Sequence, residues 1–209
     1  MTFFIPKQQL LGIFFILPLL AYGIGTALLT PFLLSPIPSS WLVVYGGAAL
    51  IILNSILVIA IGYLVSHWLH SSSVIIAKLY LFARVIEALL LLLGLGAWLY
   101  AIVYLAPADR DYLLKVQVYC YQIAMLILGV GSLAFCWGLF QSSLSLKWSL
   151  WATIGYLLLG VGSLLELLGW AHGIVLSIPG GLFELCFGLL LLISNFRPST
   201  NLSQAFPNF

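Results

Sequence analysis

The chain has 209 residues, of which 64% are apolar and only 6% are charged, and its mean hydropathy is +1.22. Because a soluble domain carries about 25% charged residues, this composition excludes a soluble globular protein and indicates a polytopic membrane protein. The net charge is only +2 and the basic residues are scattered, which excludes a nucleic-acid partner and a polybasic patch for anionic lipid.

Apolar runs of about 20 residues or more predict membrane-spanning helices. Six such runs are present, at residues 10–34, 41–65, 74–105, 116–140, 148–170 and 175–195. Short connectors rich in proline, serine and charge separate them, and none is long enough to divide the chain into domains. We therefore expect an all-α bundle of six transmembrane helices over residues 1–196, followed by a short polar tail over residues 197–209.

The distribution of basic residues predicts the orientation of this bundle. With six spans, both termini share one side of the membrane. The basic residues on that side are Lys7, Lys78, Lys147 and Arg197, whereas the opposite loops carry Arg110 and Lys115 next to Asp109 and Asp111. By the positive-inside rule, both termini are expected in the cytoplasm.

The lengths of the first and third runs bear on their roles. The first follows Lys7 and spans about 25 residues, which is too long for a signal-peptide core, so we expect it to remain in the mature chain as a membrane anchor. The third, of about 30 residues, would be about 45 Å long as a helix, beyond a hydrocarbon core of about 30 Å. That helix must tilt, kink or protrude.

Paired glycines recur in the middle of several runs, at positions 23 and 25, 94 and 96, 129 and 131, and 160 and 162. A glycine-rich phosphate loop requires a preceding strand and a helix N-terminus, which positions in the middle of a span lack. Small residues allow membrane helices to approach closely. We therefore expect these glycines to mark helix contacts.

Three of the five acidic residues, Glu87, Glu166 and Glu184, lie inside the apolar runs together with Arg84. An ionised side chain at the bilayer centre costs at least about 2.5–3.5 kcal/mol, so such residues are rare and usually face a protein interior or a wet cavity. With one arginine for three carboxyls, at least one glutamate lacks a fixed cationic partner. That glutamate is expected to stay protonated unless a cation or cationic ligand occupies the site, because burial disfavours an unpaired charge.

Arg84 and Glu87 are three positions apart and share a helical face with Tyr80, one turn earlier. Two interpretations remain open. In the first, the two charges form a structural ion pair within the helix. In the second, Arg84 binds an anionic head group or a carboxylate while Glu87 holds the guanidinium in place.

Glu184 lies about nine residues into the last run, near the middle of the bilayer. The Pro179-Gly180-Gly181 segment, one turn earlier, weakens the helix and is expected to expose carbonyl groups to a cavity. Glu184 is therefore the strongest candidate among the glutamates, with a protonated glutamate bonded to a neighbouring helix as the alternative. Glu166, close to the outer interface, is expected to reach the head groups.

No catalytic or metal-binding motif is found. The three cysteines form no CxxC pair, the histidines cannot face one another across a haem, and HExxH and GxSxG motifs are absent. We therefore expect neither a metal nor a cofactor. Asn54 adds a neutral hydrogen-bonding group near the centre of the second run, where a bond between helices is its expected role. The candidate ligand-binding or proton-binding residues are Arg84, Glu87, Glu184, Asn54 and Tyr80.

Several short motifs resemble those of a known family. They are the sequence Phe-Ala-Arg-Val-Ile-Glu-Ala at positions 82–88, the glycine-rich fourth run, Leu-Lys-Trp-Ser-Leu-Trp at 146–151 before Ile154-Gly155-Tyr156, and Pro179 followed by Phe183-Glu184-Leu185. Over residues 74–196 the chain resembles the bacterial integral membrane family of domain of unknown function 4386. The resemblance implies a six-helix bundle in a bacterial cytoplasmic membrane, with Arg84, Glu87 and Glu184 as matching polar residues, and implies no reaction. The tail from Arg197 is a departure, because such proteins often stop soon after the last helix.

These observations favour a non-catalytic membrane protein with a polar intramembrane pocket for a lipid-like or small amphipathic ligand. Its expected partners are membrane lipids and, if it is an accessory subunit, other membrane subunits. The first alternative is a small proton- or cation-coupled transporter in which Glu87 and Glu184 titrate. The second is an intramembrane enzyme that uses a buried glutamate as acid or base.

Overall fold

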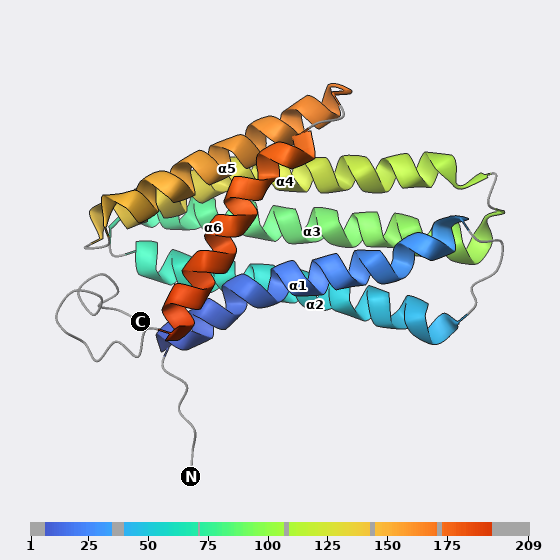
Figure 1. The fold of residues 1–209 in the computed structure, drawn as a ribbon, viewed down its shortest axis with the longest axis horizontal. Helices are drawn as coiled ribbons and strands as arrows, with labels where there is room; N and C mark the ends of the chain where they lie inside the picture. Colours follow the sequence, from blue (N-terminus) through green and yellow to red (C-terminus); the bar gives the residue numbers. More distant parts are fainter. Residues whose placement is uncertain are drawn as a thin grey trace, which may run out of the picture.

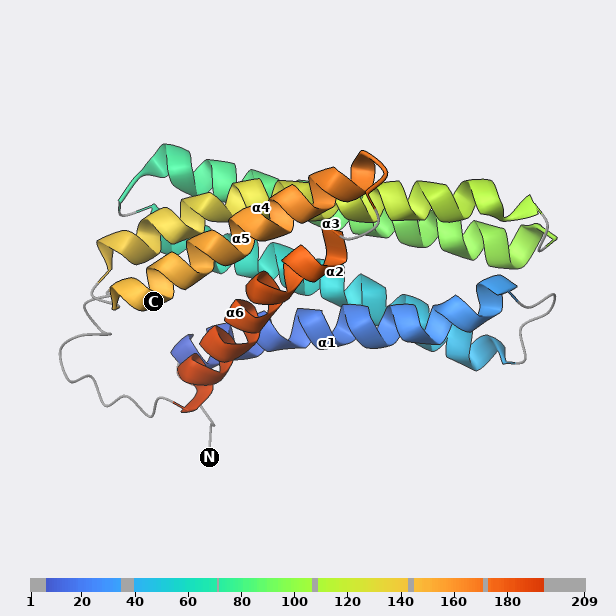
Figure 2. The ribbon, with the colours of Figure 1, turned by 45° about the horizontal axis from the view of Figure 1, so that its top comes forward.

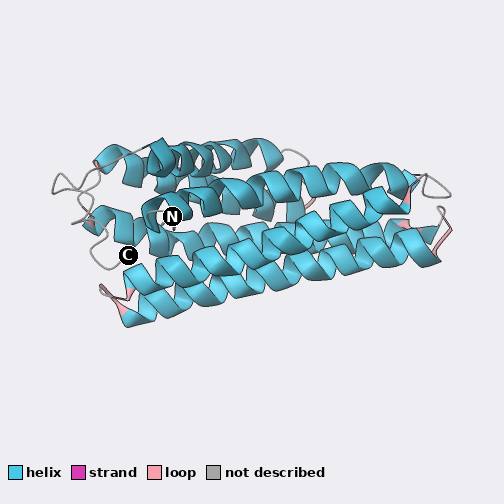
Figure 3. Ribbon diagram, turned by 90° about the horizontal axis from the view of Figure 1, so that it is seen from below, coloured by secondary structure: helices cyan, strands magenta, loops and turns pink. Residues whose placement is uncertain are grey.

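The computed structural model describes residues 7–34, 40–70, 72–106, 109–142, 145–170 and 173–193. Within these ranges the chain forms six α-helices (Figure 3). They are α1 (Lys7–Leu34), α2 (Trp41–Leu69), α3 (Val74–Tyr104), α4 (Asp111–Gln141), α5 (Leu146–Leu167) and α6 (Gly173–Ile193). All six are long and apolar enough to cross a membrane, so the predicted all-α, multi-pass fold is confirmed. The predicted polar tail at 197–209 lies outside the described residues.

The helices form a closed ring around the centre of the bundle. Each helix packs against its neighbour in the chain, and α6 crosses the bundle obliquely to return to α1 (Figures 1 and 2). The start of α1 and the end of α6 therefore lie at the same end of the bundle (Figure 1). Because α6 is inclined, it contacts α1 near the beginning of that helix, where Gly12 lies against Gly188.

The helices of the bundle fall into a longer and a shorter group. The helices α2, α3 and α4 have 29, 31 and 31 residues, whereas α5 and α6 have 22 and 21. At 1.5 Å per residue the first group is about 45 Å long and the second about 32 Å. The four helices α1–α4 extend past the α5–α6 turn at the end opposite the start of α1 (Figure 1). The sequence predicts this excess length only for the third span, and the structure extends it to its neighbours.

Among the helix boundaries that differ from the predicted spans, two have clear local reasons. The helix α4 begins at Asp111 instead of residue 116, because a carboxylate in the first turn interacts favourably with the helix dipole. The helix α5 ends at Leu167 instead of residue 170, because Gly169 adopts a φ of 90°. The Gly169 and Trp170 amides then donate to the carbonyls of Glu166 and Leu165, which is a Schellman motif.

Several glycines form close helix contacts, as the sequence predicts. A Cβ added at Gly129 would lie 2.8 Å from the backbone of Gly160, and one added at Gly25 would lie 2.9 Å from the Gly47 carbonyl oxygen. Small residues thus allow α4 to approach α5 and α1 to approach α2. The prediction fails at Gly23 and Gly96, where an added Cβ would meet nothing within 4 Å.

Two apolar clusters occupy opposite ends of the bundle. The end that holds the start of α1 contains an aromatic cluster in which Phe15, Phe135 and Phe187 contact one another with ring centroids 5.4–5.9 Å apart. The other end contains a cluster of aliphatic side chains with Phe32 and Trp98. Along α2 and α3, Asn54, Arg84 and Glu87 lie between these two clusters.

Arg110 has a structural role that the loop prediction misses. Its side chain is only 1% exposed, and it donates to the carbonyl oxygens of Phe32 at 2.8 Å and Leu105 at 3.1 Å. These carbonyls lie at the C-terminal ends of α1 and α3. The last turn of a helix leaves carbonyl oxygens without hydrogen-bond donors inside the helix. A guanidinium is well suited to this role because its N–H groups reach several acceptors and its charge complements the negative helix ends.

The glycine contacts predict that Gly129→Ala will destabilise the protein by about 1–3 kcal/mol, because the new methyl group meets backbone atoms that cannot move aside cheaply. The matched control is Gly96→Ala, at which an added Cβ meets open space. Unfolding midpoints in detergent micelles would test this. Equal midpoints for the two variants would contradict close packing between α4 and α5.

Candidate functional site

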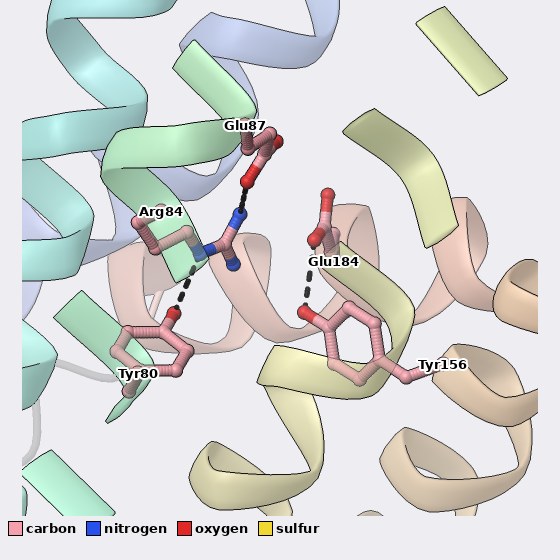
Figure 4. A network of polar contacts seen from close by, with 5 residues as sticks. All are labelled: Tyr80, Arg84, Glu87, Tyr156 and Glu184. Atoms are coloured by element: carbon pink, nitrogen blue, oxygen red, sulfur yellow. Dashed lines mark hydrogen bonds and ion pairs between the residues drawn. The ribbon is translucent and has the colours of Figure 1, made fainter. Parts of the chain in front are cut away.

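Two hydrogen-bonded groups of side chains face each other in the middle of the bundle (Figure 4). On α3, Arg84 Nη1 lies 3.1 Å from Glu87 Oε2, and Arg84 Nε donates to the Tyr80 hydroxyl at 3.0 Å. The predicted ion pair within the helix is therefore confirmed. Opposite them, the Tyr156 hydroxyl of α5 donates to Glu184 Oε1 of α6 at 2.8 Å.

A cavity of about 350 Å³ brings the candidate residues of three helices together. Its polar lining includes Asn54 of α2, Arg84 and Glu87 of α3, and Glu184 of α6. Four of the five candidate residues thus line one space. The fifth, Tyr80, is not among the lining residues, and it lies fully buried with the Arg84 guanidinium 5.2 Å from its ring centroid. Its hydroxyl and ring hold the guanidinium in place.

Gly62 on α2 makes room for the aliphatic part of the Arg84 side chain. A Cβ added at Gly62 would lie 2.7 Å from Arg84 Cβ, so only glycine leaves room for the arginine stem there. This close approach keeps Arg84 at 3% exposed and directs its guanidinium into the bundle. Figure 4 shows the guanidinium facing the Tyr156–Glu184 pair, with which Arg84 interacts electrostatically.

Two buried donor atoms of the cavity wall have no hydrogen-bond partner within the described ranges. They are Nη2 of Arg84 and Nδ2 of Asn54, on side chains that are each 3% exposed. A buried donor without an acceptor costs about 1–3 kcal/mol, and more when it is charged. The expected bond from Asn54 to another helix is therefore not made by this atom. Because both residues line the cavity, a ligand with oxygen acceptors there is a candidate partner for each of these atoms.

The remaining intramembrane features lie away from the cavity. Glu166 is half-buried in the last turn of α5, next to Gly173, at the end where the sequence predicts an interfacial position. Helix α6 continues through Pro179, whose carbonyl oxygen accepts a hydrogen bond from Trp151 Nε1 at 3.2 Å. Of the carbonyls in the Pro179-Gly180-Gly181 segment, that of Pro179 therefore takes its donor from α5.

Sequence reasoning misses three tyrosines at the site. Tyr156 binds Glu184, and Tyr22 stacks on Tyr121 in the cavity wall with ring centroids 5.4 Å apart. The signal available for Tyr156 was its position in the middle of a span, because a buried tyrosine hydroxyl usually has a partner. Nothing in the sequence indicates that Tyr22 of α1 and Tyr121 of α4 would meet, since their helices are not neighbours in the chain.

Comparison with known proteins gives one informative result. Residues 10–194 match the family described as domain of unknown function (DUF4386), so the predicted resemblance is confirmed and extends into the first two helices. No curated protein and no solved structure matches the chain. Nothing about ligand, partner or reaction follows from these comparisons.

The environments of the two glutamates predict different reactivity toward a hydrophobic carbodiimide, which modifies protonated carboxyls that it reaches from the lipid. Glu184 is half-buried in the cavity wall and accepts a bond from a neutral hydroxyl, whereas Glu87 is 2% exposed and paired with Arg84. Peptide mass spectrometry should therefore find several-fold more label on Glu184 than on Glu87. The reverse order would show that the Arg84–Glu87 pair does not form in the membrane.

Proposed function

The chain belongs to the DUF4386 family, and we propose that this multi-pass membrane protein binds a lipid-like or small amphipathic ligand in its polar cavity, without catalysing a reaction. The observation that carries the proposal is the combination of unpartnered buried donors with a space that can hold their acceptor. The cavity volume of about 350 Å³ falls in the usual range of ligand sites, about 300–1,000 Å³.

The α1 wall of the cavity supports access from the lipid. Phe15 and Pro18 of this wall are buried, but Leu19 is 39% exposed and Gly23 is also exposed. The space therefore reaches the outer surface of the bundle along α1, beyond the point where α6 crosses it. A ligand dissolved in the bilayer could enter there without passing through water.

The lining has the two-sided character that an amphipathic molecule requires. Asn54, Arg84 and Glu184 present polar groups, whereas Leu19 and Met125 present apolar ones. A polar head group would contact the first set, while its apolar body would lie along the second and continue into the lipid. This arrangement needs no chemical step, and a binding or accessory role is therefore the simpler assignment.

The orientation and location of the protein are part of the proposal. Lys78 and Lys147 lie near the starts of α3 and α5, at the end of the bundle where α1 starts and α6 ends. This supports the placement of both termini in the cytoplasm by the positive-inside rule. The host membrane would be a bacterial cytoplasmic membrane, with lipids and other membrane subunits as partners.

The excess of carboxyls favours one alternative, a proton- or cation-coupled transporter. Two glutamates and one arginine line the cavity, so one carboxyl has no cation to itself among the described lining residues. Proton uptake into proteoliposomes separates the two functions, with Glu184→Gln as the test variant. Coupled transport requires a flux that this variant loses, whereas a binding protein gives no flux in either form.

Lateral access predicts that Gly23→Leu will reduce ligand retention, because the new side chain fills the mouth of the cavity where an added Cβ has free space. Gly96→Leu is the matched control, with open space around its Cβ and a position outside the cavity wall. Native mass spectrometry from membranes would measure the fraction of protein that retains a lipid or other amphiphile. We expect at least a fivefold loss for Gly23→Leu relative to the control. Equal retention in the two variants would contradict entry along α1.

A further inference from the structure

The charges around the cavity limit the class of ligand that it can hold. Glu87 is paired with the Arg84 guanidinium, but Glu184 receives its hydrogen bond from the neutral hydroxyl of Tyr156. The lining therefore carries one carboxyl more than it carries cationic groups, within the part of the chain that the structure describes. An unpaired carboxylate is costly in an apolar environment, so this position favours either a proton or a cationic group.

The unpartnered donors impose a second and independent requirement. Arg84 Nη2 and Asn54 Nδ2 lie on α3 and α2, and both residues line the same cavity as Glu184 on α6. Both atoms donate only, and both side chains are 97% buried. They require oxygen acceptors on the α2–α3 side of the same space in which Glu184 favours a cation.

We propose that the ligand is a zwitterionic amphiphile with a primary ammonium group, an inference that rests on the proposed function. Its ammonium would donate to Glu184, and its phosphate or carboxylate oxygens would accept from Arg84 and Asn54. A purely anionic head group would satisfy the donors but add negative charge opposite Glu184. A simple cation would leave both donors without acceptors. A quaternary ammonium carries the charge but has no N–H to donate to the carboxylate.

Competition between lipids tests this assignment. The protein would be reconstituted into vesicles of equal parts phosphatidylethanolamine, phosphatidylcholine and phosphatidylglycerol, and the retained lipid identified by native mass spectrometry. We expect phosphatidylethanolamine to be retained at least tenfold over either competitor. Soluble phosphoethanolamine, added in excess, tests whether the head group alone is recognised. Displacement of the lipid assigns the site to a soluble zwitterion, and its persistence assigns the site to the lipid itself.

Two variants separate the parts of the inference. Glu184→Gln removes the anionic partner of the ammonium and should abolish the preference for phosphatidylethanolamine over phosphatidylcholine. Glu166→Gln is the matched control, because that carboxyl is not among the cavity residues and the preference should remain. Asn54→Leu removes one donor at similar size and should lower total lipid retention. Size-exclusion profiles and helical circular dichroism confirm that each variant is folded.

The outcomes distinguish the inference from the proposed function. Retention of phosphatidylglycerol, lost in Asn54→Leu but unchanged in Glu184→Gln, would overturn the zwitterion assignment and leave the ligand pocket in place. Retention that is equal for all lipids and unaffected by Asn54→Leu or Gly23→Leu would overturn both.

Discussion

A buried polar group of a membrane bundle needs a partner from the protein or from a ligand, and the Arg84 guanidinium is where this constraint acts most strongly. Water is absent from the hydrocarbon core, so an arginine there depends on the groups around it. Tyr80 and Glu87, each within one turn on the same helix, satisfy two of its nitrogens. Gly62 on the neighbouring helix leaves room for its stem, and the third nitrogen has no partner among the described residues, although Arg84 lines the cavity. The packing thus brings a charged donor into the middle of the bundle and leaves it incompletely satisfied there.

The same constraint explains the other buried arginine and gives a useful contrast. Arg110 is as deeply buried as Arg84, but its nitrogens donate to carbonyl oxygens at the ends of α1 and α3. It therefore holds two helix ends together and needs nothing from outside the protein. Arg84 differs because it lies between the two apolar clusters, at a cavity that two carboxyls and an amide also line. A structural arginine and a candidate ligand-binding arginine are thus distinguished by whether the fold supplies all their acceptors.

Much of this architecture was predictable from the sequence, because the bilayer imposes simple rules on helix length and composition. Run length gave the helices, three-residue spacing gave the Arg84–Glu87 pair, and small residues indicated helix contacts such as that at Gly129. Contacts between helices distant in the chain were not predictable in this way. The Tyr156–Glu184 bond depends on how α6 packs on α5, and the Tyr22–Tyr121 stack depends on how the ring closes. In the sequence Arg110 is an ordinary charged loop residue. Its structural role depends on the positions of the ends of α1 and α3, which the sequence does not give.

The central claim is that the cavity beside Arg84 is a ligand site and not a gap that side chains fill in the membrane. An experimental structure of protein extracted with its native lipids, at a resolution that shows side chains, tests it most directly. The account predicts non-protein density in the cavity, within hydrogen-bonding distance of Arg84 Nη2 and Asn54 Nδ2. A structure in which Glu184 closes directly onto Arg84, with no space between the two side chains, would contradict it.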